Sequence, residues 1–400
     1  MDVYRSEVHI INKNHRLFKY CDDICFKSKN LYNYANYILR QEYIETKKVI
    51  GSFDLNKMLK DEDVFRALPA KTSQQVIIKL GNNWTSFLKG IKDWSKNKDK
   101  YLGKPKLPKY KEKDGRNIVM FDYQQGSLKN GRYRFPKSEE YIETNILKEQ
   151  FRQIQIVPYG SCYKLSIIYR KEMTESQENN NNFLAIDLGV DNLATLTNNI
   201  GLQPIVINGK ILKSMNQYYN KKLGKLKSYV GNKSSNRIKK LSSKRNNKFN
   251  TYFHKVSKYI ISYCKENNIG NIVIGKNDKW KQKSKMSKKV NQKFVQIPYE
   301  ILIYQLKYKS EDNSINVIVI NESYTSKASF IDSDKIPTKF GDYEFSGKRI
   351  KRGLYQSKDG ILINADVNGS YNILRKRNPQ FKYDERIEGI SLYPVRLNIA

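Results

Sequence analysis

The chain has 400 residues, of which 39% are hydrophobic and 12% aromatic, so it is long and apolar enough for a buried core and is not a disordered chain. Its 74 Lys and Arg residues outnumber 39 Asp and Glu residues, and the formal net charge of +35 indicates a polyanionic partner, most often nucleic acid. No stretch approaches the roughly 18 apolar residues of a spanning helix, no apolar signal segment opens the chain, and the four cysteines form no CxxC pair, so we expect an intracellular protein without a membrane partner.

The first part of the chain mixes strand and helix patterns. Residues 2–12 alternate as a strand does, and residues 22–45 have the periodicity of a helix, with further helices to about Trp94. A proline-punctuated basic segment follows at 100–115. Three later segments again alternate as strands do: 132–138, 151–160 and 162–172. The polar stretch 173–182 is expected to be a linker.

After this linker the pattern changes to that of an α/β domain. Three strands are predicted at 182–190, 193–199 and 203–209. Between Gly209 and Asn250 there are 13 Lys or Arg residues and no acid, which predicts a basic helix or helical hairpin. The remaining elements alternate strand and helix and are, in order, a strand at 271–275, a helix at 298–313, a strand at 315–327 and a helix that opens at 363–377. This order, with an insertion before the last helix, is that of an RNase H-like fold, and the tail from Asn378 has no clear pattern.

Three acids are candidates for one metal site. Asp187 lies inside an apolar strand, where an unpaired carboxylate is costly, and Asp366 lies at the start of the last helix. Cleavage of a phosphodiester by two divalent ions needs carboxylates that converge from separate elements. A third acid is expected at the end of the fourth strand, but that position is Gly275. Glu322, just beyond the fifth strand, is the alternative ligand.

Each of these acids also has a simpler interpretation, and for Asp187 it is a cap or turn acid at a strand end. Asp366 in a first helical turn is favoured by the helix macrodipole alone. Glu322 would be an ordinary surface acid if it did not reach Asp187, since neighbouring strands lie about 4.8 Å apart and Glu322 starts about two spacings away. In that case the site would be inactive. The three scattered histidines and the lack of a P-loop do not support HExxH, HNH or nucleotide-hydrolysing chemistry.

Six segments of the C-terminal half form an ordered set: AIDLGVDNLATL, NIVIGKNDKWKQ, NQKFVQIPYEILIYQLKYKSE, INESYTSKASF, GKRIKRGLYQS and LINADVNGSYNILRK. Taken together, these segments resemble the TnpB family, the RNA-guided nucleases of IS200/IS605- and IS607-type insertion sequences, which are related to Fanzor proteins and Cas12 effectors. In the N-terminal half, NNWTSFLKGIKDW and GKPKLPKYKEKDGRN are similar to the family's recognition region, and IQIVPYGSCYKLSIIYRKE to its wedge domain. The resemblance covers nearly the whole chain.

The resemblance implies a multidomain protein of mixed α/β and β architecture with an RNase H-like (RuvC) nuclease domain. The implied domains are a β-barrel-like wedge domain at 1–20 and 126–182, a helical recognition domain inserted at 21–125, the nuclease domain at 183–322 and 361–400, and a target-binding insertion at 323–360. The implied activity is Mg²⁺- or Mn²⁺-dependent hydrolysis of both strands of target DNA beside a short adjacent motif, directed by a guide RNA transcribed from the end of the element. Whether the protein is a monomer or a dimer stays open.

The sequence departs from the commonest family pattern at two places. Asp187 and Asp366 match the first and third RuvC acids, but the second is replaced by Gly275. A subset of the family uses a relocated glutamate, which Glu322 matches, so Asp187, Glu322 and Asp366 are the predicted catalytic, metal-binding residues and Gly275 is expected to tolerate Ala. The insertion has no Cys or His between Ser323 and Asn364, so no structural zinc is expected, and a zinc-less ribbon or a lid is predicted.

A protein that recognises an RNA–DNA duplex through its backbone needs dispersed cations rather than a compact base-reading motif. The segment 276–293 has eight Lys and one Asp, and Trp280 within it is either a base-stacking or a packing residue. The predicted nucleic-acid contacts are Lys104, Lys106, Lys109, Lys221, Lys222, Lys239, Lys240, Trp280, Lys281, Lys327, Arg349 and Arg352.

Two other functions fit parts of the pattern. The lost strand-four acid would suit a nuclease-dead, RNA-guided DNA-binding repressor, although retention of three acids argues against it. A strand-transfer transposase of the DDE type is also RNase H-like. Such enzymes usually end the acid series with Glu on the last helix, where this chain has Asp366.

Overall fold

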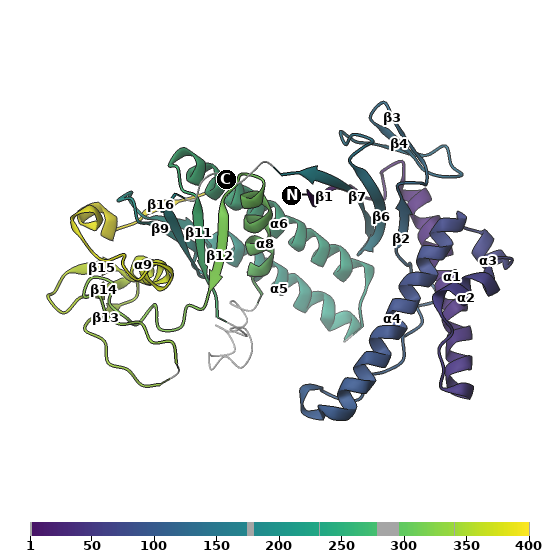
Figure 1. Ribbon diagram of the computed structural model, residues 1–400, viewed down its shortest axis with the longest axis horizontal. Coiled ribbons are helices and arrows are strands. Elements are labelled where there is room, and N and C mark those ends of the chain that lie inside the picture. The colour runs from purple at the N-terminus through teal and green to yellow at the C-terminus, as the bar shows by residue number, and fades with distance from the viewer. Residues whose placement is uncertain (1, 174–179, 232, 278–295, 340, 400) are drawn as a thin grey trace. The chain divides into compact units, whose positions relative to one another are not determined.

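The computed structural model describes residues 2–173, 180–231, 233–277, 296–339 and 341–399 (Figure 1). The chain divides into two compact units, an N-terminal unit of residues 2–172 and a C-terminal unit that begins at Met173. The predicted contacts Trp280 and Lys281 lie outside the described residues. Within these residues, no helix is long and apolar enough to cross a membrane.

The N-terminal unit combines two antiparallel sheets with a group of helices. The larger sheet has the order β1-β7-β6-β2, and its strands are β1 (Asp2–Ile11), β2 (Val119–Asp122), β6 (Phe151–Tyr159) and β7 (Cys162–Glu172). The smaller sheet contains β3 (Ser127–Lys129), β4 (Arg132–Arg134) and β5 (Tyr141–Glu143). Both sheets are open as described, so barrel-like closure stays a prediction.

The helices of this unit occupy the sequence between β1 and β2, as the periodicity predicts. They are α1 (Phe18–Thr46), α2 (Ser52–Leu59), α3 (Asp63–Arg66) and α4 (Ala70–Lys96), followed by the short η1 (Lys98–Lys100). Helices α1 and α4 pack together around Trp84, which is fully buried and donates a 2.9 Å hydrogen bond from its indole nitrogen to Asn36 Oδ1. A buried indole with a satisfied N–H fixes the register of the two helices.

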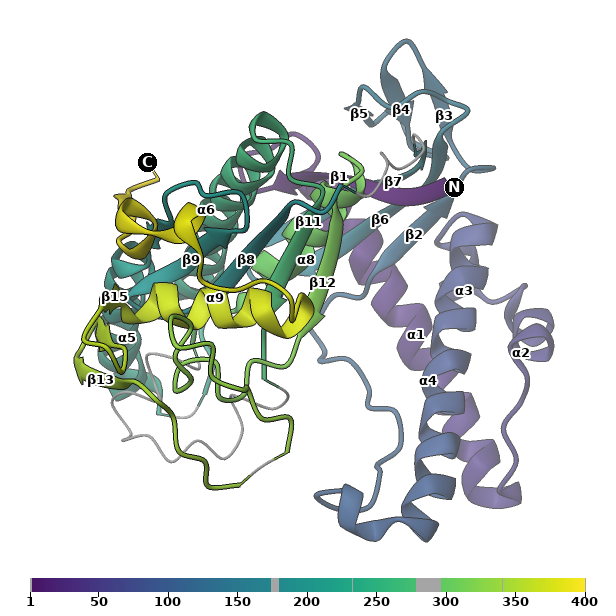
Figure 2. The same ribbon diagram turned by 60° about the vertical axis from the view of Figure 1, so that its left-hand side comes forward.

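The C-terminal unit is built on a six-stranded mixed sheet with the order β12-β11-β8-β9-β10-β16 (Figure 2). Its strands are β8 (Phe183–Leu188), β9 (Asn192–Asn198), β10 (Ile205–Asn208), β11 (Asn271–Gly275), β12 (Asn316–Ile320) and β16 (Val395–Leu397). Strand β9 is antiparallel to both neighbours, whereas β8, β11 and β12 run parallel. Parallel strands end at the same edge, so the carboxyl ends of these three strands meet there.

Helices cover both faces of this sheet. The helices α5 (Lys210–Val230), α6 (Asn236–Glu266) and α8 (Tyr299–Glu311) belong to the face that buries Ile186 and Ile274. The opposite face buries Ala185 and Val273 beneath α9 (Ala365–Arg377), which crosses the strands in Figure 2. Because successive side chains of a strand point to opposite faces, Asp187 shares the α9 face with Ala185.

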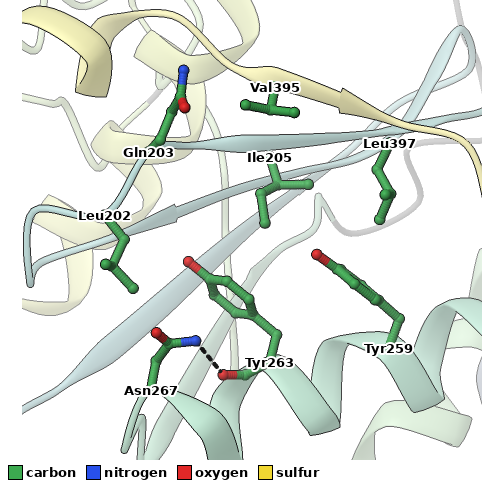
Figure 3. Close-up of a pocket in the computed structure, with 8 residues that line it drawn as sticks. All are labelled: Leu202, Gln203, Ile205, Tyr259, Tyr263, Asn267, Val395 and Leu397. Atoms are coloured by element: carbon green, nitrogen blue, oxygen red, sulfur yellow. Dashed lines mark hydrogen bonds between the residues drawn. The ribbon is translucent and has the colours of Figure 1, made fainter.

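The insertion before α9 forms a small antiparallel sheet of β13 (Lys348–Lys351), β14 (Leu354–Gln356) and β15 (Leu362–Asn364). After α9 the chain passes through η2 (Glu385–Ile387) and η3 (Gly389–Leu392) before β16 pairs in parallel with β10. Strand β16 lies within the tail that begins at Asn378, for which the sequence pattern predicts no element. At this edge of the sheet, Tyr259 and Tyr263 of α6 line a pocket of about 300 Å³, and none of the three candidate acids contributes to it (Figure 3).

Candidate active site

The register of the parallel strands brings the predicted acids to one edge of the sheet. Ile186 of β8 is paired with Ile274 of β11, so Asp187 and Gly275 are the next residues along each strand. Gly275 in turn is paired with Ile320, the last residue of β12. Glu322 therefore lies two residues beyond the end of β12, in the same corner of the sheet.

Asp187 faces α9 in a crowded position. A Cβ atom at Gly369 of α9 would lie only 3.0 Å from Asp187 Oδ2, so a glycine leaves the room that this carboxylate occupies. Burial raises the pKa of Asp187 well above its usual range, and the negative charges of Glu322 and Asp366 raise it further, while Arg349 opposes them. Asp187 therefore experiences the charges of both other predicted acids, although the three come from separate elements.

Glu322 occupies the space beside the position where a strand-four acid is expected. A Cβ atom at Gly275 would lie 2.8 Å from Glu322 Oε2 and 2.4 Å from Ile373 Cδ1. The Glu322 carboxylate thus lies against Gly275, in the space that a side chain at that position would need. The same distances argue against the expectation that Gly275 tolerates Ala, because the added methyl group would displace both neighbours.

Only one of the two carboxylate oxygens of Glu322 has a hydrogen-bond partner among the described residues. Its Oε1 accepts a 3.3 Å hydrogen bond from Asn277 Nδ2, whereas Oε2 is buried and has no hydrogen-bond partner among the described residues. Burial raises the pKa of Glu322 to about 7, and the nearby positive charge of Lys376 opposes this rise. A buried acceptor without a partner is costly unless an ion or a ligand satisfies it.

Asp366 stands in the first turn of α9 but is not the residue that caps it. Asn364 Oδ1 accepts hydrogen bonds from the amides of Asp366 and Val367, at 3.0 and 3.2 Å. The Asp366 side chain is free for other contacts: Oδ2 accepts a 2.6 Å hydrogen bond from Asn192 Nδ2, and Oδ1 lies 3.9 Å from the Arg349 guanidinium. The macrodipole favours an acid here, but a separate asparagine performs the capping.

The site fits a divalent cation only in part. Among the described residues, no group of three or more His, Cys, Asp or Glu side chains is compact enough to hold a metal ion as it stands. Mg²⁺, however, typically binds one or two protein carboxylates and fills its octahedron with water and substrate phosphate oxygens. A cation would relieve two features of the site: the unpartnered Glu322 Oε2, and the burial and negative neighbours that together raise the pKa of Asp187. The donor set, all oxygen, is one that Mg²⁺ or Mn²⁺ prefers.

Two arginines of the insertion lie beside these acids. Arg349, on β13, approaches Asp366, and Arg352, in the turn after β13, forms an ion pair with Asp191. Asp191 also accepts a 2.7 Å hydrogen bond from Lys213 Nζ, and these two cations hold the pKa of Asp191 below its usual range. Asp191 is thus a neutralised structural acid, unlike the three candidates.

The other predicted nucleic-acid contacts that the structure describes are all exposed, and they are Lys104, Lys106, Lys109, Lys221, Lys222, Lys239, Lys240 and Lys327. Lys221 and Lys222 lie on α5 and Lys239 and Lys240 on α6, which confirms the predicted basic helical hairpin as a structure. Its role in binding stays a prediction.

Three supporting residues escaped sequence reasoning. Asn192 holds Asp366, Asn277 holds Glu322, and Lys376 contacts the loop on both sides of Glu322. A polar side chain just beyond a buried strand, such as Asn277 two residues after β11, is the kind of signal that marks a site at a sheet edge. Asn192 and Lys376 offered no comparable signal, since their partners lie far away in the sequence.

Comparisons with known proteins find two family models that match parts of the C-terminal unit. Residues 166–281 match the family model OrfB_IS605, described as a probable transposase, and residues 299–373 match the Cas12f1-like TNB domain. These matches confirm the predicted resemblance to the TnpB family and to Cas12 effectors. A comparison with curated proteins gives no significant match.

The similar solved structures include two cryo-EM structures. A Cas12f1–sgRNA–target DNA complex is 13% identical, with a TM-score of 0.37, and the match covers 92% of this chain and 98% of that one. A CRISPR–Cas12f ternary complex is 14% identical, with a TM-score of 0.36, and the match covers 92% and 82% of the two chains. Similarity at these TM-scores carries no functional conclusion by itself.

Proposed function

We propose that the protein is an RNA-guided DNA endonuclease of a transposable element, with an RNase H-like (RuvC) nuclease domain in its C-terminal unit. One observation carries this proposal: Glu322 after the end of β12 and Asp366 of α9 lie close enough to Asp187 of β8 for their negative charges to raise its pKa, in addition to the larger effect of burial. A strand order with β8 central and β9 antiparallel supports the RNase H-like assignment. The net charge of +35 supports nucleic-acid partners.

In this mechanism the three carboxylates would hold divalent cations, with ligands completed by water and the scissile phosphate. Bound Mg²⁺ supplies Lewis-acid stabilisation of the phosphate and lowers the pKa of a coordinated water. Asn192 and Asn277 orient Asp366 and Glu322 through their amide groups. Arg349, which already approaches Asp366, is placed to contact the negative charge that develops on the phosphate.

The remaining parts have proposed roles in holding nucleic acid. The basic hairpin of α5 and α6 would contact the phosphate backbone of the guide–target duplex, and the insertion would hold the target strand. The N-terminal unit would combine the wedge and recognition regions that bind guide RNA and read the adjacent motif. Its helices between β1 and β2 are consistent with a helical domain inserted into a β domain.

The test is a cleavage assay with purified protein, element-end RNA, matching double-stranded DNA and Mg²⁺. Asp187→Asn, Glu322→Gln and Asp366→Asn are each expected to reduce cleavage by at least 100-fold and to leave RNA binding within about twofold of the wild type. Asp359→Asn, which changes an exposed acid of the insertion, is the control and should cut normally. Normal cutting by any of the three site variants would refute the site.

A nuclease-dead binder is the second candidate, and one observation favours it. The described acids do not form a compact three-residue metal group, and Arg349 stands close to Asp366. If the wild-type protein binds guide RNA and target DNA tightly but leaves the DNA intact in both Mg²⁺ and Mn²⁺, this second function replaces the first.

A further inference from the structure

The last turn of α9 contacts the loop that carries Glu322. Lys376 Nζ donates a hydrogen bond to Asn321 O, at 3.1 Å, and another to Ser323 O, at 2.7 Å. These two carbonyl groups belong to the residues immediately before and after Glu322. A single ammonium group therefore bridges the backbone on both sides of the candidate ligand.

The carbonyl group between them is held as well. Thr325 donates to Glu322 O from its amide, at 3.2 Å, and from its hydroxyl, at 2.8 Å. One turn before Lys376, Asn372 Nδ2 donates to Thr325 O at 3.0 Å and to Ala328 O at 2.7 Å. Three successive carbonyl groups thus have donors, and α9 supplies those of the first and third.

This arrangement matters because Glu322 lies outside the sheet. Strand β12 ends at Ile320, so the ladder of hydrogen bonds that fixes Asp187 on β8 does not extend to Glu322. A ligand on a loop holds its position only when neighbouring groups fix the loop. Lys376 is also the cation that acts on the Glu322 carboxylate, since its charge opposes the effect of burial there.

Helix α9 consequently serves the site at both ends. Its first turn contributes Asp366, and Lys376 of its last turn donates to the backbone on both sides of Glu322. Ten residues at 1.5 Å per residue separate the two positions by about 15 Å, so the helix acts as a spacer between two parts of one site.

We propose that Lys376 is a positioning residue for the metal site: it fixes Glu322 for cation binding by bridging the carbonyl groups of Asn321 and Ser323. The inference rests on the proposed function. Lys376 does not itself bind the cation or the substrate. Groups that orient a metal ligand typically contribute 10–100-fold to metal affinity or activity, so its loss is expected to raise the half-saturating Mg²⁺ concentration by about tenfold.

The experiment compares Lys376→Met with Lys376→Arg, which keeps a cationic donor, and with Arg377→Met, which removes one exposed charge from the same turn. Amide hydrogen exchange of the peptide 316–328 is measured without metal. Lys376→Met should exchange at least fivefold faster in this peptide and unchanged in β8. Lys376→Arg and Arg377→Met should both match the wild type.

Mg²⁺ titrations follow by thermal shift and by cleavage. Lys376→Met should need about tenfold more Mg²⁺ in both assays, with partial recovery of cleavage at saturation. Unchanged exchange and unchanged Mg²⁺ dependence would overturn the positioning role. If Lys376→Met does not fold, Lys376→Gln replaces it in the same comparison. Glu322→Gln separates the two proposals. Normal cleavage by Glu322→Gln rejects the metal site itself. Loss of cleavage in Glu322→Gln, together with wild-type exchange and Mg²⁺ dependence in Lys376→Met, rejects only the positioning role.

Discussion

Replacing Glu322 by Gln is expected to stabilise the metal-free protein while abolishing its activity. Burial raises the pKa of Glu322 from 4.5 to about 7. Because ionisation of this carboxyl group is harder in the folded than in the unfolded state, it lowers the free energy of unfolding wherever the unfolded group is charged. This penalty is absent below pH 4.5, grows between pH 4.5 and 7, and is complete above pH 7. At about 1.4 kcal/mol for each pH unit, this penalty amounts to about 3 kcal/mol at pH 8. Gln has nearly the same shape and carries no charge, so it should remove the penalty.

Urea denaturation in the presence of a chelator measures this effect at pH 5, 6, 7 and 8. The difference in the free energy of unfolding between Glu322→Gln and the wild type should be below about 1 kcal/mol at pH 5 and rise to about 3 kcal/mol at pH 8. Glu344→Gln, at an exposed position, is the control and should stay within about 0.5 kcal/mol throughout. Added Mg²⁺ should stabilise the wild type at pH 8 but not Glu322→Gln. A difference that does not change with pH would refute the buried, ionisable ligand.

Three further predictions concern the glycine of α9 beside Asp187, the basic hairpin of α5 and α6, and the absence of zinc. Gly369→Ala should reduce cleavage at least tenfold, because the added Cβ atom would lie 3.0 Å from Asp187 Oδ2. The control is Gly224→Ala in α5, where an added Cβ atom would have no neighbour within 4 Å. This control should leave cleavage unchanged and stabilise the protein by about 1 kcal/mol. Changing both Lys239 and Lys240 to Gln should lower the slope of log K against log salt for the guide–target duplex by about 1.5–2, and an unchanged slope would place both lysines outside the interface. A zinc chelator should leave the melting temperature unchanged, and a drop would reveal a metal that the sequence does not predict.

The C-terminal unit could be predicted in detail because its pattern is regular. The three opening strands, the basic hairpin and the strand–helix–strand sequence that follows all have strong periodicity, and each forms as expected. Strand β16 was missed because its three residues gain their structure from pairing with β10, and so short a segment carries no periodic signal of its own. The barrel-like closure of the N-terminal unit rested on resemblance alone, and the described strands form two open sheets.

The candidate site was predictable in its acids but not in its supports. A carboxylate inside an apolar strand, as at Asp187, is unusual enough to notice in the sequence. The groups that hold the acids are ordinary polar residues, and nothing in the sequence distinguishes Lys376 or Asn192 from many others of their kind. Their roles depend on which backbone groups the fold brings near them. The structure argues against the expected tolerance of Gly275 to Ala, because the sequence does not show how little space is free at this residue.

The space at Gly275 also explains how the third acid can be supplied from a different strand. Any side chain at this position would occupy the volume that Glu322 Oε2 needs, so the absent strand-four acid and the relocated glutamate are coupled. Gly275→Ala should therefore destabilise the wild type by roughly 1–3 kcal/mol. In a Glu322→Ala background one of the two close contacts disappears, and the cost of Gly275→Ala should fall by at least 0.5 kcal/mol, the lower end of coupling between contacting residues. Ile373→Val, which shortens the other close neighbour, should also lower the cost. Urea denaturation of the single and double variants measures both couplings, and strict additivity in the Glu322 cycle would mean that Glu322 does not occupy the space beside Gly275.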